Sequence, residues 1–189
     1  TVMVADATRL ERNINMVLQV LQITDRAVLC VNLIDEAERN HISIDLRALS
    51  RRLGIPVVGA SARSGRGIGE LLEAVRAVAS GTFVCRPPRG FDLPADTAAE
   101  VNRLTAAVRT AHPELSNAEW IATRLLERDE GVRRAYATPE LNALADEIHL
   151  AIGHNFHDRW MEQIYARAGE ICAAAVRRPG GEGLLPLDV

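Results

Sequence analysis

The chain has 189 residues, with 22 Lys+Arg against 25 Asp+Glu for a net charge of -3, and 48% of it is hydrophobic but only 4% aromatic. This composition is typical of one or two globular domains and excludes collagen-like, disordered and mini-protein classes. Every one of the 22 basic residues is Arg. The sequence therefore cannot contain a phosphate-binding GxxxxGK(S/T) loop, a Schiff-base lysine or a lysine general base.

Strand-like and helix-like patterns alternate over the first half of the chain. Short apolar runs predict buried parallel strands at 1–5, 27–31 and 55–60. Apolar residues at helical spacing predict a helix after each strand, at 10–21, 45–53 and 67–79. This alternation predicts an α/β fold with a parallel sheet and right-handed crossovers, whose ligand sites lie at the carboxyl ends of the strands.

For two of these helices the sequence also predicts a cap or a buried face. Thr8 and Glu11 have the spacing of a capping box at the start of the first helix. In the helix at 67–79, five apolar side chains fall on one face and are expected to point inward: Ile68, Leu71, Leu72, Val75 and Val78.

The second half of the chain contains no such strands. A Pro/Gly stretch at 86–90 interrupts the pattern, and four helices are predicted after it, at about 95–111, 117–127, 139–152 and 156–176. The Gly/Pro-rich end has the composition of a linker. The sequence thus predicts an α/β domain at 1–82, an all-α helical domain at 83–178 and a linker or tail at 179–189.

Charge and cysteine content narrow the class of protein further. Acidic and basic residues are mixed, so the sequence does not favour a nucleic-acid partner. No apolar run approaches the roughly 18 residues of a membrane span and no leader opens the chain, so we expect a soluble piece. The cysteines Cys30, Cys85 and Cys172 are far apart and odd in number, which favours the reducing cytoplasm over a disulfide framework.

An NxxD motif directly follows the second predicted strand. Guanine presents its N1-H and its exocyclic amino group as adjacent donors, which one carboxylate, here Asp35, can accept together. Asn32 would bind the N7 of the base and connect neighbouring loops. Asn and Asp are also ordinary turn residues after a strand, so the motif alone leaves that interpretation open.

A second motif, Ser61-Ala62-Arg63, follows the third predicted strand at the equivalent place. A backbone N-H there can reach the guanine O6, and the small Ala62 lets the base approach. The whole stretch 61–67 (SARSGRG) can equally be a flexible connection between a strand and a helix. Together the two motifs predict a guanine pocket.

The first 80 residues resemble the ferrous iron transport protein B (FeoB) family. Residues 4–13 (VADATRLERN) are similar to its "VDAT-LERNL" stretch, and residues 49–58 (LSRRLGIPVV) to its "LS-LGVPVV". Residues 18–21 resemble its "LQLLE", 31–35 match its NxxD segment, and 65–71 its GxGxxEL helix start. Similarity continues more weakly into the family's helical domain, at 120–127 and 156–171.

The resemblance implies the later part of a P-loop-type GTPase domain followed by the family's helical domain. In the family this cytoplasmic unit binds GTP, hydrolyses it slowly and gates ferrous iron uptake through a membrane domain. The implied ligand is GTP or GDP. The residues implied to bind its base are Asn32, Leu33, Ile34, Asp35, Ser61, Ala62 and Arg63.

The same resemblance implies a partner and a location. The partner is the membrane transport domain of the same parent protein, at the cytoplasmic face of the bacterial inner membrane. A homo-oligomer is left open.

The chain also departs from the family pattern. The family's P-loop, switch threonine and DxxG loop are not in this sequence, so we expect a fragment that retains base recognition without phosphate recognition. Mg²⁺ would bind only if the missing N-terminal part were present, and we expect no catalytic residue and no metal site in the fragment itself.

A competing interpretation is a nucleotide-independent helical module that binds a partner or a metal. His149, His154, His157 and Asp158 form a HxxxxHxxHD cluster that could place two imidazoles on adjacent helical turns. Gly153 falls inside the cluster and is expected to end a helix. The preferred interpretation of the cluster is therefore an exposed connection between helices. Cys30, inside an apolar strand, is expected to be a buried core thiol, Cys172 lies on a predicted helix beside alanines, and neither is expected to be a nucleophile.

Overall fold

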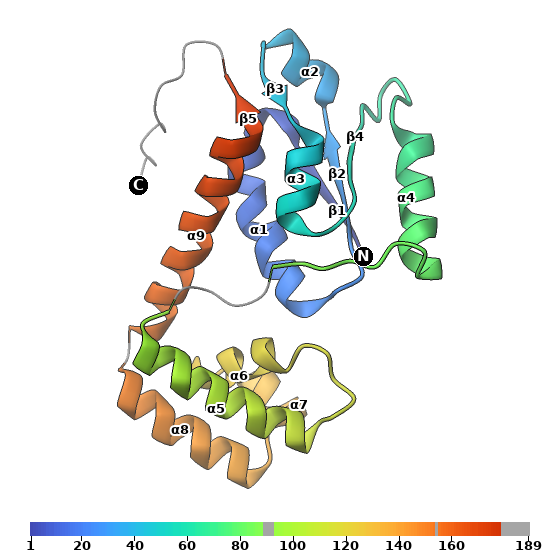
Figure 1. The fold of residues 1–189 in the computed structure, drawn as a ribbon. Helices are drawn as coiled ribbons and strands as arrows, with labels where there is room; N and C mark the ends of the chain where they lie inside the picture. Colours follow the sequence, from blue (N-terminus) through green and yellow to red (C-terminus); the bar gives the residue numbers. More distant parts are fainter. Residues whose placement is uncertain (89–92, 154, 179–189) are drawn as a thin grey trace. The chain divides into compact units, whose positions relative to one another are not determined.

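The computed structural model describes residues 1–88, 93–153 and 155–178. These residues form two compact units, which are best described separately (Figure 1). Among the described residues, the first unit contains Thr1–Val17, Arg26–Pro88 and residues 168–178, and the second contains Leu18–Asp25 and the helical segment that ends at Arg167. The predicted tail at 179–189 lies outside the described residues, and the limits 1–82 and 83–178 remain predictions.

A three-stranded parallel sheet lies at the centre of the first unit. Its strands are β1 (Val2–Asp6), β2 (Val28–Asn32) and β4 (Val57–Gly59), in the order β1-β2-β4. Residues 28–31 of the central strand are all buried, as expected for a parallel strand covered on both faces. Each strand falls on one of the three apolar runs, so the predicted α/β fold class is confirmed.

Helices follow the strands of this sheet. They are α1 (Leu10–Ile23), α2 (Ile34–Arg39), α3 (Leu46–Leu53) and α4 (Ile68–Ser80). Figure 1 shows α1 and α3 on one side of the sheet and α4 on the other. The predicted inward face of α1 is buried throughout, at Leu10, Ile14, Val17, Leu18 and Leu21.

The chain enters α1 differently from the prediction. A short 3-10 turn at Ala7–Arg9 (η1) precedes the helix, and Asp6 caps it. Oδ1 of Asp6 accepts the Thr8 N-H and the Thr8 hydroxyl, both at 2.7 Å. The Thr8–Glu11 capping box was therefore wrong, because the Thr8 N-H, which the Glu11 side chain would accept in such a box, donates to Asp6 instead.

The inward face predicted for α4 is only partly buried. Val78 is 7% exposed, but Leu72 is 49% exposed, and the other three apolar positions are half-buried. Val2 and Val4 on β1 are also exposed. Helical periodicity identifies the apolar face of a helix correctly, but it does not say whether enough residues lie opposite to cover that face.

A second, two-stranded sheet joins distant parts of the chain within the first unit. β3 (Ser43–Ile44) pairs antiparallel with β5 (Val176–Arg177), and the Asp45 N-H donates to the Ala175 carbonyl at 2.8 Å. Neither strand was predicted, because two residues are too few for an alternating pattern. The end of the last helix is thereby attached to the segment that follows α2.

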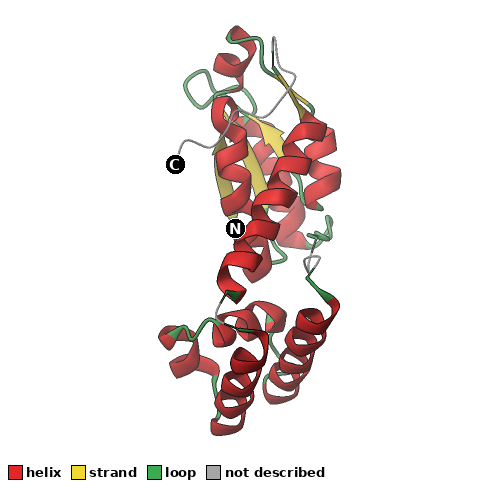
Figure 2. Ribbon diagram, turned by 90° about the vertical axis from the view of Figure 1, so that its left-hand side faces the viewer, coloured by secondary structure: helices red, strands yellow, loops and turns green. Residues whose placement is uncertain are grey.

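The second unit is helical (Figure 2). Its helices are α5 (Ala95–Ala111), α6 (Ala118–Leu126), α7 (Glu130–Tyr136), α8 (Pro139–Ile152) and the first part of α9 (Phe156–Ala175). Four of these were predicted, and their limits agree within one residue. The seven-residue α7, capped by Asp129, was missed. Within the described part of the chain, no helix combines the length and the apolar character that crossing a bilayer needs.

Candidate functional site

The two predicted motifs lie at the carboxyl ends of neighbouring strands. Asn32 is the last residue of β2, and Ser61 follows β4 after a single intervening residue. Between β2 and α2, Leu33 adopts the left-handed conformation with φ 61°. This turn places Asp35 in the first turn of α2, so the NxxD motif spans a strand end and a helix start rather than a loop.

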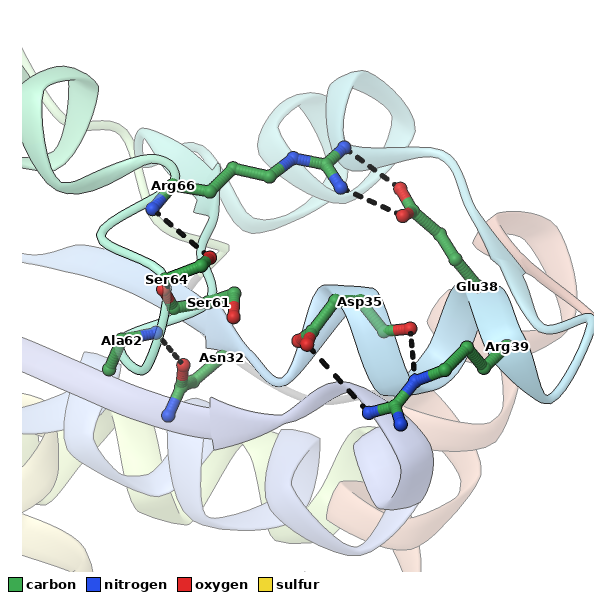
Figure 3. Close-up of polar contacts among 8 residues, drawn as sticks. All are labelled: Asn32, Asp35, Glu38, Arg39, Ser61, Ala62, Ser64 and Arg66. Carbon is green, nitrogen blue, oxygen red and sulfur yellow. Dashed lines mark hydrogen bonds and ion pairs between the residues drawn. The ribbon is translucent and has the colours of Figure 1, made fainter.

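Asn32 connects the two motifs. Its side-chain Oδ1 accepts the backbone N-H of Ala62 at 3.0 Å (Figure 3). The amide nitrogen of Asn32 makes no hydrogen bond with the residues that the structure describes. That nitrogen is therefore available to donate to a ligand.

Asp35 faces the start of the second motif (Figure 3). Its side chain is 40% exposed, yet its Oδ1 is buried and accepts no hydrogen bond from the described residues. The Ser61 hydroxyl lowers the pKa of Asp35 below the usual 3.8, and the Asp35 backbone N-H and the charge of Arg39 act in the same direction against partial desolvation. Asp35 is thus an ionised carboxylate with an oxygen that lacks a donor.

The residues 61–67 form a compact turn that we call the SA loop. Its ends are held by a bridge between Ser61 and Arg66, with the Ser61 N-H donating to the Arg66 carbonyl at 3.0 Å. Inside the turn, the Ser64 N-H donates to the Ser61 carbonyl. Ser61 is buried, whereas residues 62–66 are exposed. The loop is therefore ordered by its own backbone and presents its tip to solvent.

Gly67 ends the SA loop and caps α4. Its φ is +81°, and a Cβ at this position would lie 2.1 Å from the carbonyl oxygen of Gly59. No residue other than glycine fits without a shift of the backbone. The close approach of the loop to the end of β4 depends on this glycine.

A bidentate ion pair connects the far end of the SA loop to α2. Arg66 donates to both carboxylate oxygens of Glu38, at 2.7 and 2.8 Å (Figure 3). The interaction lowers the pKa of Glu38 and raises that of Arg66. Neither residue was predicted as part of the site, because no sequence pattern indicates that two charges 28 positions apart will meet.

The remaining predicted residues are divided between the site and the core. Arg63 is exposed on the SA loop, and its N-H makes no hydrogen bond with the described residues. Leu33 is half-buried at the turn, whereas Ile34 is 8% exposed and belongs to the core. The structure thus brings Asn32, Asp35 and the 61–63 segment together.

A cavity of about 460 Å³ lies beside this site rather than at it. It is lined by Ile34, Glu38, His41, Ile42, Ser43, Ile44, Leu46 and Arg66. Ile34 is the only one of these that was predicted to bind guanine. The Glu38–Arg66 pair therefore borders a hollow with an otherwise largely apolar lining.

The histidine cluster is divided between helices. Nδ1 of His149 on α8 lies 3.0 Å from the Leu126 carbonyl, and Nδ1 of His157 on α9 lies 2.6 Å from Glu127. Gly153 ends α8 as predicted, with φ +84°. His154 lies outside the described residues. The residues that the structure does describe contain no group of three His, Cys, Asp or Glu side chains arranged to hold a metal.

The two buried thiols are poor nucleophiles. Burial raises the pKa of Cys30, and burial together with the nearby Glu11 raises that of Cys172 to about 12. A thiol with a raised pKa contains little thiolate at neutral pH. Both cysteines lie in the core, as the sequence predicted for Cys30.

Comparison with known proteins identifies relatives of both units. The family described as "Ferrous iron transport protein B" matches residues 1–75, and the family described as "FeoB cytosolic helical domain" matches residues 94–177. The Fe(2+) transporter FeoB of Salmonella typhimurium is 43% identical over 72 residues. That match covers 38% of this chain and 9% of the relative, so the matched segment spans less than a tenth of the relative's length.

Solved structures share the fold. A mutant of S. thermophilus NFeoB bound to GDP has a TM-score of 0.80 at 22% identity, covering 92% of this chain and 67% of that chain. The cytosolic domain of L. pneumophila FeoB has a TM-score of 0.75 at 22% identity, covering 94% of this chain and 67% of that one. The two family matches together account for most of the sequence. The chain therefore belongs to the ferrous iron transport protein B family, which it matches through part of the GTPase domain and through the cytosolic helical domain.

Proposed function

We propose that this chain recognises the base of a guanine nucleotide and thereby contributes to the nucleotide-dependent regulation of a ferrous iron transporter. One observation carries the proposal. Asp35, with a buried oxygen that lacks a donor, faces the SA loop, which Asn32 holds in place at the ends of two adjacent strands. A carboxylate that can accept further hydrogen bonds, beside N-H groups that can donate, matches the adjacent donors and acceptors of guanine.

The hydrogen-bonding groups of guanine match those that are available. The N1-H and the exocyclic amino group would donate to the Asp35 carboxylate, and the free amide nitrogen of Asn32 would donate to N7. The Ala62 N-H is already bonded to Asn32 at 3.0 Å, so the Arg63 N-H is the proposed donor to O6. Adenine has an acceptor at N1 and no amino group at position 2, so it would offer no N-H group to the Asp35 carboxylate at those positions.

Phosphate binding is not expected from this sequence, which contains no lysine and no P-loop. Each missing charge-assisted hydrogen bond would contribute roughly 1.5–3 kcal/mol, so base contacts alone should bind at least about ten-thousandfold more weakly than a complete site. The base preference should therefore be measured at millimolar ligand. Mg²⁺, which would accompany the phosphates, is not assigned to any residue of this chain.

The test is an NMR titration of the ¹⁵N-labelled 189-residue chain with GDP and, separately, with ADP. These ligands carry the same phosphates, so a difference between them reports the base. We expect GDP to bind more tightly and to shift the amide signals of Asn32, Ala62 and Arg63. Equal affinity for GDP and ADP would contradict the proposal.

Asp35→Asn should change the base preference in a defined way. The amide would accept the N1-H but present an N-H to the guanine amino group, so GDP affinity should fall by about tenfold or more. Xanthosine diphosphate carries a carbonyl in place of the guanine amino group, so the affinity of the variant for xanthosine diphosphate should rise. Asp25→Asn, which makes the same change at an exposed position after α1, is the control and should bind GDP like the wild type.

The wider part of the proposal concerns the parent protein. Membership of the FeoB family and the match to its cytosolic helical domain support a regulatory unit at the cytoplasmic face of the bacterial inner membrane, with a membrane transport domain as its partner. In this unit, binding of GTP or GDP to the first unit would control Fe²⁺ uptake.

A further inference from the structure

We infer that the Glu38–Arg66 ion pair is a positioning latch that holds the SA loop against α2 and so determines how tightly a guanine base is retained. This inference rests on the proposed guanine site. It adds two residues to that site which do not touch the base and which the NxxD and Ser-Ala-Arg motifs do not contain.

The geometry connects the latch directly to the base-binding residues. Glu38 lies one helical turn after Asp35 on α2, and Arg66 pairs with Ser61 across the base of the SA loop. The two terminal guanidinium nitrogens of Arg66 donate to the Glu38 carboxylate, at 2.7 and 2.8 Å. A bidentate pair fixes orientation as well as distance, so it holds the loop at a defined position relative to Asp35.

Few other side-chain interactions hold the far end of the loop. Among the described residues, the Asn32–Ala62 hydrogen bond attaches the loop at its start, and the Glu38–Arg66 pair attaches it at its end. Residues 62–66 are exposed. The cavity bordered by Glu38 and Arg66 means that packed side chains do not fill the space beside the pair. Loss of the pair would leave the end of the loop held by the Ser61–Arg66 backbone bridge and by the long hydrogen bond, 3.5 Å, from the Arg66 N-H to the Ser64 hydroxyl.

Because the Glu38–Arg66 pair is exposed, we expect it to affect the SA loop without changing the stability of the whole domain. The Arg66 and Glu38 side chains are 56% and 53% exposed, and pairs this exposed contribute little to the stability of a whole domain. Local opening of a loop is governed by the few contacts that the loop itself makes. Removal of the latch should therefore change guanine binding and loop opening while the unfolding transition stays in place.

The experiment compares Glu38→Arg, Arg66→Glu and the double exchange in the 189-residue chain. GDP and ADP affinities are measured by NMR titration, and amide hydrogen exchange is followed at Ser61 and Ser64, whose N-H groups close the loop. We expect each single variant to weaken GDP binding by up to about fivefold, in line with the coupling of exposed pairs, and to speed exchange at both amides. The double variant, in which the two charges are swapped, should restore both the GDP affinity and the amide exchange rates toward the wild-type values.

A matched control is available in the helical unit. Arg103 forms an exposed pair with Glu147 at 3.0 Å, with side chains 50% and 63% exposed. Arg103→Glu makes the same charge reversal and should change neither GDP binding nor exchange in the SA loop. High salt should reduce the difference between the wild type and the single variants, because it screens exposed charges.

The outcomes distinguish this inference from the function on which it rests. Suppose that the wild type prefers GDP and that the single variants have the same GDP affinity and the same amide exchange rates. The latch proposal is then wrong, and the proposed guanine site stands. If the double exchange fails to recover, the effect is not the pairing of these charges and the latch is again wrong. If the wild type itself does not distinguish GDP from ADP, the guanine site fails and the latch fails with it.

Discussion

At the scale of single residues, Asp35 must be ionised to accept two donors from guanine. The Ser61 hydroxyl lowers its pKa below 3.8, so the carboxylate keeps its charge as the pH falls toward that value and is protonated only in stronger acid. GDP binding should therefore be constant between about pH 8 and pH 5 and weaken only below about pH 4.

Ser61→Ala tests the cause of this shift. Removal of the hydroxyl takes away the largest influence that lowers the pKa, so the Asp35 titration should move to higher pH. An NMR titration of the Asp35 carboxyl carbon measures it directly. A wild-type midpoint above 3.8, or the same midpoint in both proteins, would contradict the assigned role of Ser61.

Gly67 is the residue at which a single methyl group should disturb the site most. Gly67→Ala combines a positive φ with a clash 2.1 Å from the Gly59 carbonyl oxygen, and should lower the free energy of unfolding by about 1–3 kcal/mol. Gly69→Ala, where the added methyl meets nothing within 4 Å, should be neutral or stabilise α4 by up to about 1 kcal/mol. Urea denaturation of both variants provides the comparison. Equal stabilities would show that the backbone at Gly67 can relax.

At the scale of the elements, the second unit contains two helix starts that can be compared, one with a side-chain cap and one without. The Thr138 hydroxyl accepts the Leu141 N-H at the start of α8, whereas Asn117 makes no side-chain cap bond at the start of α6. Thr138→Ala should therefore destabilise the unit by about 1 kcal/mol, and Asn117→Ala by clearly less. Tryptophan fluorescence during urea unfolding reports this unit, because Trp120 and Trp160 both belong to it. A larger loss for Asn117→Ala would contradict the assignment of the caps.

The sequence predicted those elements whose determinants are local. Thr138 with Pro139 marks the start of α8, and Gly54 ends α3 in the left-handed conformation, with φ 64°. It missed the short helices α2 and α7 and the β3–β5 pair. Each of the two helices has too few residues to show a clear helical period, and the β3–β5 pair depends on contact between residues more than 130 positions apart.

The site followed the same rule. Asn32, Asp35 and Ser61 were predicted as site residues because each lies close to a strand end, where parallel sheets place their ligand sites. The meeting of Glu38 with Arg66 requires a particular loop conformation, which depends on the positive φ angles of Gly65 and Gly67. Local patterns therefore predict candidate base-binding residues, but not the ion pair that we propose to hold them in place.

At the scale of the whole molecule, the proposed link between guanine recognition and iron uptake can be tested in cells. Asp35→Asn in the gene that encodes this chain should lower Fe²⁺ uptake, because the regulatory unit would no longer respond to GTP or GDP. Uptake of radioactive iron, corrected for protein level by immunoblot, measures the effect, with Asp25→Asn as the control. Unchanged uptake in the Asp35 variant would separate base recognition from transport.

The short ladder between β3 and β5 has a mechanical consequence. Along the covalent chain, more than 130 residues separate Asp35 from the end of α9, among them the helical segment that ends at Arg167. Through this ladder, only the rest of α2 and the turn after it lie between them. Two residue pairs and the Asp45–Ala175 hydrogen bond form this connection. Tension applied to the chain beyond α9 would load these few bonds together with the contacts of Arg178 with Thr8 and Glu11. Through the ladder, part of that force would reach the segment that follows α2, the helix that carries Asp35.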